Sequence, residues 1–139
     1  MSGISTLSRA LGEGIERALI HAWAMATIVL ALGGSLLRPE IADRHSWLEE
    51  LVGIVRDRVA ADDRIGIVVG GGAPAREGIE LARPIVDSEA RLDRIGIAAT
   101  RLNATIVREA LADAGVMVSG TIPHTVNEAA MLFDERPVV

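Results

Sequence analysis

The chain has 139 residues, 50% of them hydrophobic and 24% charged, and its formal net charge is −5 at pH 7. This length is enough for one domain that buries a core of its own. Cysteine is absent and aromatic residues make up 2% of the chain, so disulfide scaffolds, thiolate metal sites and cysteine nucleophiles are excluded. The acidic balance argues against a nucleic-acid-binding protein, which needs a basic face.

The basic residues are 14 arginines, without a single lysine. A Schiff-base amine and an ammonium clamp for phosphate are therefore excluded, and a fixed cation has to be a guanidinium or a bound metal ion. The histidines His21, His45 and His124 lack metal-ligand spacing, and we expect them at surface or capping positions. Ser35 does not lie in a G-x-S-x-G elbow, so we do not expect a hydrolase nucleophile.

The N-terminal region contains a long apolar stretch over residues 18–32. It falls short of the roughly 20 residues that a bilayer span needs, and acidic residues in its preceding flank disfavour a secretory signal. The chain before it has apolar residues at helical spacing: Ile4, Leu7, Leu11, Ile15 and Leu19. We therefore expect residues 1–24 to form a helical N-terminal extension of a cytoplasmic chain that does not enter a membrane.

From residue 26 onward a strand, a glycine turn and a helix follow one another twice. Continuous apolar runs over residues 26–32 and 65–69 predict buried parallel strands. Between them, residues 41–59 carry a helical stripe of Trp47, Leu48, Leu51, Val52, Ile54, Val55 and Val59. Asp62 and Asp63 after that helix indicate a solvated turn.

The second half of the chain is mainly helical. The predicted elements are a helix over 75–82, a helix over 92–112, a short strand over 116–118, a helix over 126–132 and the start of a buried strand at 138–139. Pro74 suits a first helical turn, and Gly115 suits a helix cap. In the long helix we expect an inward face made of Ile95, Leu102, Ile106, Val107 and Leu111. The alternation of apolar strands and helices predicts an α/β fold with a mainly parallel, helix-flanked sheet.

Two glycine turns, residues 33–35 and residues 70–72, follow the two predicted strands. Ligands of open α/β sheets bind at the carboxyl edge of the strands. Successive glycines let backbone N–H groups approach an anion without interference from Cβ atoms, so the turns predict a phosphate site. Arg76 strengthens it, because a cation in a first helical turn opposes the helix dipole. The alternative for Arg76 is a surface ion pair with Glu80.

The second turn also supports a different class of enzyme. Gly70, Gly72 and Ala75 spell G-x-G-x-x-A after a strand, as in dinucleotide-binding domains, and Asp87 or Glu89 could be the acid that follows. A NAD(P)-dependent oxidoreductase is therefore an alternative hypothesis. A Walker A loop is excluded by the spacing.

The long helix carries four polar residues in an apolar segment: Asp93, Thr100, Arg101 and Asn103. They could face a ligand. Alternatively, Asp93 is an N-cap or an acid of the first helical turn, and Arg101 is a solvated charge. Periodicity alone favours this second interpretation, and the sequence assigns no specific role to Thr100, Arg101 or Asn103.

Three segments in this order, IVLALGGSLLRPE, IGIVVGGGAPAREGIELAR and LDRIGIAATRLNA, resemble the amino acid kinase superfamily. Within it they are similar to UMP kinases of the archaeal type, for which the third segment is the specific one. The resemblance extends from Met25 to Val139 and implies a three-layer α/β sandwich. The related isopentenyl phosphate kinases usually have a histidine in the second glycine motif, where this chain has none.

The resemblance implies phosphoryl transfer from MgATP to UMP, giving UDP for pyrimidine nucleotide biosynthesis, in a homohexamer. By position, Gly33, Gly34 and Ser35 would line the phosphates at the transfer point, and Gly71 and Asp93 would bind UMP. Gly72 and Arg76 would lie on the ATP-phosphate side, so the expected catalytic set is Gly33, Gly34, Ser35 and Arg76. Mg²⁺ is expected with ATP, without identifiable ligands in this chain.

The chain departs from the family pattern in two places. Ala31 stands where relatives often carry a polar or charged residue. The family also continues past Val139 with a Gly-Gly-Thr loop and the half that binds adenine and Mg²⁺. We therefore expect residues 25–139 to be the acceptor-side part of the domain, truncated at the C-terminus. A non-catalytic nucleotide-binding or assembly module remains an alternative.

Overall fold

The computed structural model describes residues 25–37 and 43–139. The extension expected at residues 1–24 lies outside this range, as does the expected helix start near residue 41. In chain order the elements are β1 (Thr27–Leu32), the 3-10 helix η1 (Gly34–Leu37), α2 (Arg44–Ala60), β2 (Arg64–Val69), α3 (Gly72–Ala82), α4 (Glu89–Asp113) and α5 (Val126–Leu132). The predicted helices and the first two strands are confirmed.

The sheet is parallel and extends beyond its two regular strands. β1 pairs with β2 so that Leu30 lies opposite Ile67. Val138 forms parallel bridges to both Ile65 and Val118, which places the C-terminal residues between β2 and the segment around Val118. The predicted strand at 138–139 is therefore in the middle of the sheet, whereas the one over 116–118 is reduced to a single bridge.

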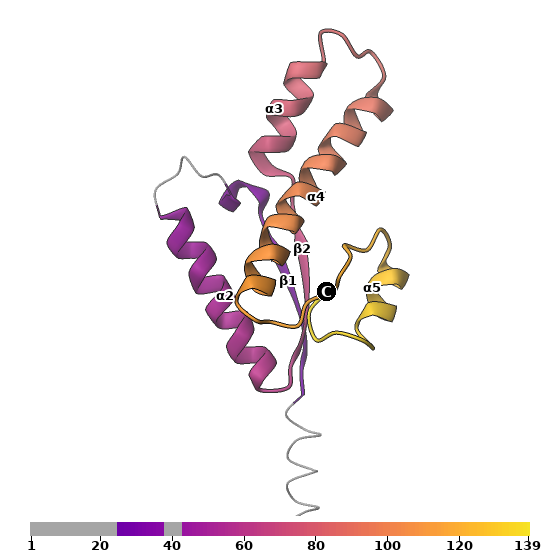
Figure 1. Ribbon diagram of the computed structural model, residues 1–139. Helices are drawn as coiled ribbons and strands as arrows, with labels where there is room; N and C mark the ends of the chain where they lie inside the picture. Colours follow the sequence, from indigo (N-terminus) through magenta and orange to yellow (C-terminus); the bar gives the residue numbers. More distant parts are fainter. Residues whose placement is uncertain (1–24, 38–42) are drawn as a thin grey trace, which may run out of the picture.

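Helices lie on both faces of this sheet, as the sequence predicts. α2 and α4 cover one face and α5 lies on the other (Figure 1). The core between the sheet and the α2–α4 layer is formed by Leu51, Val55, Ile65, Val107, Leu111, Val116 and Val138. Side chains of β1 at Leu30 and Leu32 pack against it. This arrangement confirms the helix-flanked α/β class.

The second face of the sheet is less covered than the apolar strands predict. Val29 is 67% exposed and Val68 is 61% exposed. The short helix α5 and the residue after it cover only part of this face: a Cβ at Gly66 would lie 3.1 Å from the ring of Phe133. The prediction that both strands are fully buried is wrong for this face, because the described residues place only α5 against it.

α3 and α4 pack against each other as a hairpin that extends above the sheet (Figure 1). The buried residues of α4 are Leu92, Asn103, Val107 and Leu111. Leu102 and Ile106, predicted to face inward, are 57% and 38% exposed. The inward stripe is therefore rotated from the predicted one, and a polar residue is part of it.

The C-terminus of α4 ends in a Schellman motif. Gly115 has φ +80° and donates its N–H to the carbonyl of Ala112, while Val116 donates to the carbonyl of Leu111. Both bonds satisfy carbonyls that a helix end leaves open. The apolar side chains of Val116 and Leu111 join the core. The predicted cap at Gly115 is confirmed.

Asp63 corrects the prediction of a solvated turn before β2. Its side chain is 1% exposed, and Oδ1 accepts a hydrogen bond of 2.8 Å from the N–H of Ala26. The guanidinium of Arg58 lies 2.6 Å from Oδ2. Asp62 does occupy an exposed turn position, with φ +64°. Asp63 instead fixes the start of β1 to the start of β2.

Candidate functional site

The two glycine turns touch each other at the carboxyl edge of β1 and β2. A Cβ added to Gly34 would lie 2.1 Å from the carbonyl oxygen of Gly70. A Cβ at Gly72 would lie 2.3 Å from the carbonyl carbon of Gly34 and 2.4 Å from the nitrogen of Ser35. Side chains at these positions would collide with backbone, so the contact depends on glycine. The structure thus brings the two predicted turns into one site.

The second turn has the backbone conformation of an anion-binding nest. Gly71 has φ −75° and ψ −32°, and Gly72 has φ +57°. This succession of right-handed and left-handed residues makes neighbouring N–H groups converge on one concavity. Those of Gly72 and Ala73 also belong to the first turn of α3, where the helix dipole favours negative charge. The arrangement can bind a phosphate group through backbone alone.

α4 forms a wall behind the second turn. A Cβ at Gly71 would lie 3.2 Å from Cγ2 of Thr100 and 3.5 Å from the carbonyl oxygen of Gly96. The side chain of Asn103, 1% exposed, donates from Nδ2 to the carbonyls of Gly70 at 2.8 Å and Gly71 at 3.2 Å. Sequence reasoning singled out Asn103 but gave it no role.

The spacing of residues along α4 could have indicated that Asn103 is buried. It precedes Val107 by one helical turn and Leu111 by two, and both of these are buried. A polar residue on the buried stripe of a helix needs internal hydrogen-bond partners. Which backbone groups would supply them depends on how the second turn lies against α4, and this depends on tertiary packing.

The neighbouring polar residues of α4 do not face the turns with polar groups. The hydroxyl of Thr100 donates to the carbonyl of Ile97 in its own helix. The guanidinium of Arg101 donates to the carbonyls of Ile122 at 2.9 Å and Pro123 at 3.5 Å. The interpretation of Arg101 as a solvated charge is therefore wrong, since it holds the segment that precedes α5.

Arg76 and Asp93 are exposed side chains near the turns. Arg76 lies on α3 one helical turn after Gly72. Within the described parts of the chain it forms no ion pair with Glu80. Asp93 lies on α4 about one turn before Gly96, which borders Gly71. Both charges flank the glycine turns, and among the described residues neither side chain forms a hydrogen bond or ion pair with the turns.

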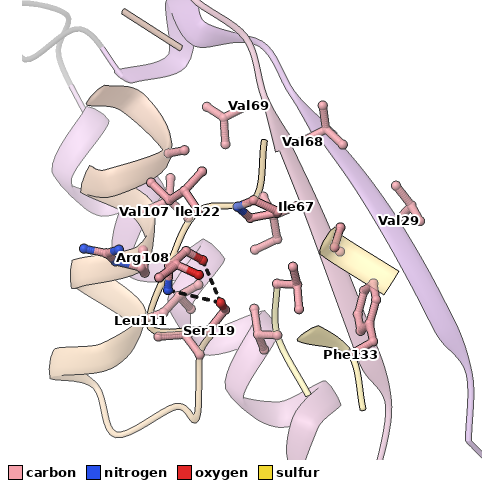
Figure 2. Close-up of a pocket in the computed structure, with 18 of the residues that line it drawn as sticks. Val29, Ile67, Val68, Val69, Val107, Arg108, Leu111, Ser119, Ile122 and Phe133 are labelled. Carbon is pink, nitrogen blue, oxygen red and sulfur yellow. Dashed lines mark hydrogen bonds between the residues drawn. The ribbon is translucent and has the colours of Figure 1, made fainter. Parts of the chain in front are cut away.

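A mostly apolar cavity lies next to this edge, and Val69 and Thr100, which border the second turn, help to line it. It has a volume of about 510 Å³ and lies between α4, α5 and the end of β2 (Figure 2). Its lining is mostly apolar and includes Val29, Val68, Val107 and Phe133. The glycines of the two turns are not among the described residues that line it. The candidate site is consequently an open sheet edge and not this cavity.

The described residues offer no metal-ligand cluster at the site. Over residues 25–37 and 43–139, no group of three His, Asp or Glu side chains could hold a metal ion. A side-chain hydrogen bond from Arg83 to Glu89, supported by their opposite charges, raises the pKa of Arg83; both residues lie at the far end of the α3–α4 hairpin. None of the helices in these ranges is long and apolar enough to cross a bilayer.

Comparison with known families identifies the architecture. Residues 26–135 match the amino acid kinase family. The chain belongs to this family. The match covers both glycine turns and the whole α3–α4 hairpin, so the resemblance inferred from three sequence segments is confirmed.

Several relatives are archaeal uridylate kinases. The enzyme of Methanospirillum hungatei is 47% identical over 90 residues, which cover 65% of this chain and 37% of the relative. The enzyme of Archaeoglobus fulgidus is 35% identical over 128 residues, covering 78% and 56%. The crystal structure of uridylate kinase from Archaeoglobus fulgidus is similar, with a TM-score of 0.67 and 38% identity, over 81% of this chain and 48% of that chain. The chain thus spans about half the length of these relatives, or less.

The family also removes support for the dinucleotide alternative, and the structure gives the physical reason. Asp87 lies in the loop between α3 and α4, and Glu89 opens α4, where it pairs with Arg83 at 2.7 Å. A dinucleotide-binding domain needs this acid where it can accept hydrogen bonds from a ribose beside the turn. Neither residue ends a strand here, so the G-x-G-x-x-A pattern of the second turn does not indicate a dinucleotide-binding domain.

Proposed function

We propose that this chain forms the acceptor-nucleotide part of a UMP kinase, which transfers the γ-phosphoryl group of ATP to UMP and so supplies UDP for pyrimidine nucleotide synthesis. The observation that carries the proposal is the backbone contact between the two glycine turns. Phosphoryl transfer requires positioning and charge stabilisation more than a protein nucleophile. Two turns of N–H donors in contact support that chemistry in a chain without lysine or cysteine.

The residues of the edge divide into two groups of proposed roles. Gly33, Gly34 and Ser35 line the phosphates at the transfer point, and Gly72 and Arg76 lie on the ATP-phosphate side. Gly71 contacts UMP, and Asp93 accepts hydrogen bonds from its ribose hydroxyls. The nest conformation at Gly71 and Gly72 supports phosphate binding. The exposed positions of Arg76 and Asp93 beside the turns leave both side chains accessible to a ligand.

Mg²⁺ accompanies ATP in this reaction, and the described residues do not fit a protein-held ion. Carboxylate oxygens are the ligands that Mg²⁺ prefers, and no cluster of acidic or histidine side chains is present in the described ranges. We therefore assign no residue of this chain to the metal. The cytoplasmic location expected from the N-terminal sequence remains a prediction, as does the homohexamer implied by the resemblance.

A second candidate function is a nucleotide-binding or assembly module without catalysis. The nest at Gly71 and Gly72 can bind a phosphate group through backbone N–H groups alone, and binding without transfer requires no more than this. The two functions differ in one product. Incubation with UMP and MgATP, followed by chromatography of nucleotides, yields UDP if the chain is a kinase. A module binds UMP and yields none.

The residue roles are tested by removing the two charges. Arg76→Ala should weaken ATP binding and Asp93→Ala should weaken UMP binding, each by about tenfold, which is the size of one charge-assisted contact. The melting temperature should stay the same because both side chains are exposed. Calorimetric titration measures the affinities, with Arg94→Ala as an exposed control on α4. Unchanged affinities in both folded variants would show that the assignments are wrong.

A further inference from the structure

Asn103 is a buried polar residue that the proposed roles leave unused. Its carboxamide nitrogen carries two hydrogens, and these meet the carbonyls of two successive residues, Gly70 and Gly71. Among the described side chains that are buried and polar, the others are Asp63 and Ser119. Asp63 binds the start of β1 and Ser119 binds its own turn. Asn103 alone of the three contacts the glycine edge.

These two hydrogen bonds fix the direction of the N–H groups that follow each carbonyl. A trans peptide is planar, and its C=O and N–H point in opposite directions. With the carbonyl of Gly70 held toward α4, the N–H of Gly71 points away from α4. With the carbonyl of Gly71 held in the same way, the N–H of Gly72 also points away. One side chain therefore orients two N–H groups of the nest, those of Gly71 and Gly72.

Asparagine is well suited to this task. Both carbonyls belong to glycines, whose backbone is freer than that of other residues. The carbonyl of Gly71 accepts a second bond at 3.3 Å from the N–H of Ala75, but that bond alone does not hold the peptide between Gly70 and Gly71. An aspartate at position 103 would present oxygens to two carbonyl oxygens and would lose both bonds.

We propose that Asn103 is a positioning residue for phosphate: it holds the peptides after Gly70 and Gly71 so that the N–H groups of Gly71 and Gly72 face the phosphate of the bound nucleotide. The inference rests on the proposed function, because a phosphate at the second turn is what gives this orientation a purpose. It differs from a purely structural role in one respect. Substitution of Asn103 should weaken phosphate binding more than a substitution elsewhere on the same helix face that costs the same stability.

The test compares three variants of the whole chain. Asn103→Asp removes the donors with almost no change of shape, and Asn103→Ala removes them without adding a charge. Val107→Ala is the matched control, because Val107 lies one turn further along the same buried face, is 2% exposed and has an apolar side chain that donates no hydrogen bond to the turns. UMP and inorganic phosphate are the two probes. The readouts are calorimetric affinity and the amide NMR signals of Gly71 and Gly72.

We expect UMP and phosphate to shift the Gly71 and Gly72 signals in the parent chain and in Val107→Ala. Both Asn103 variants should lose affinity for each probe on the order of tenfold, because a small misplacement of binding groups weakens the interaction. The probes should also no longer shift the Gly71 and Gly72 signals in these variants. Equal affinities in the Asn103 variants and Val107→Ala would overturn the inference and leave the proposed function in place. Phosphate binding without UMP binding in the parent would overturn the proposed function only. Binding of neither probe would overturn both.

Discussion

At the scale of single residues, the contact between the glycine turns depends on the absence of two side chains. Gly34→Ala would place a methyl group 2.1 Å from the carbonyl oxygen of Gly70, and backbone on both sides prevents an easy adjustment. We expect a loss of about 2 kcal/mol or more in unfolding free energy, as in overpacked cores, and loss of UMP binding. Urea denaturation measures the first and calorimetry the second.

Gly33→Ala is the matched control for stability, since its Cβ would meet only Oγ of Ser35 at 3.8 Å. It should unfold at nearly the same urea concentration as the parent chain. If Gly34→Ala is as stable as Gly33→Ala, the two turns do not touch in solution as described.

A second residue-scale prediction concerns Asp63. Asp63→Ala leaves the N–H of Ala26 without its acceptor and removes the partner of Arg58. We expect a loss of about 2 kcal/mol, mainly from the buried hydrogen bond to a charged group, because the guanidinium of Arg58 is 51% exposed and its ion pair is screened. Asp57→Ala, on the exposed side of α2, should change stability little. Comparable losses in the two variants would contradict the role of Asp63.

At the scale of elements, the sequence predicted every described α-helix but not the 3-10 helix η1, because apolar spacing over several turns records which side faces the core. It located the inward face of α4 less well. Leu102 and Ile106 were predicted to be inside and are exposed, while Asn103 is buried. A hydrophobic pattern cannot anticipate a polar residue that is buried to bind the backbone of another segment.

Two glycines in and after helices give opposite predictions at this scale. Gly53 lies inside α2 with open space around its Cβ position, so Gly53→Ala should stabilise the protein by about 0.5–1 kcal/mol through helix propensity. Gly115 has equally open space but φ +80°, so Gly115→Ala should destabilise it by about 1 kcal/mol. Thermal unfolding followed by circular dichroism measures both. Shifts of the same sign would contradict the assigned helix end.

At the scale of the whole molecule, the meeting of the two glycine turns follows from the parallel α/β pattern, because the turns come after neighbouring strands. The sequence therefore predicted which edge of the sheet carries both turns. It could not predict the exposed face around Val29 and Val68, because an apolar strand gives no sign of which partner covers each face. It also could not predict that Asp63 is buried, since local sequence there favours a turn and the partner at Ala26 is distant along the chain.

The proposed function requires that the glycine edge of this amino acid kinase chain binds UMP. Calorimetric titration of the purified chain with UMP tests it most directly, with AMP and NADH as controls. We expect saturable binding of UMP and much weaker binding of both controls. A cooperatively folded chain that does not bind UMP, or that binds AMP or NADH equally well, would contradict it.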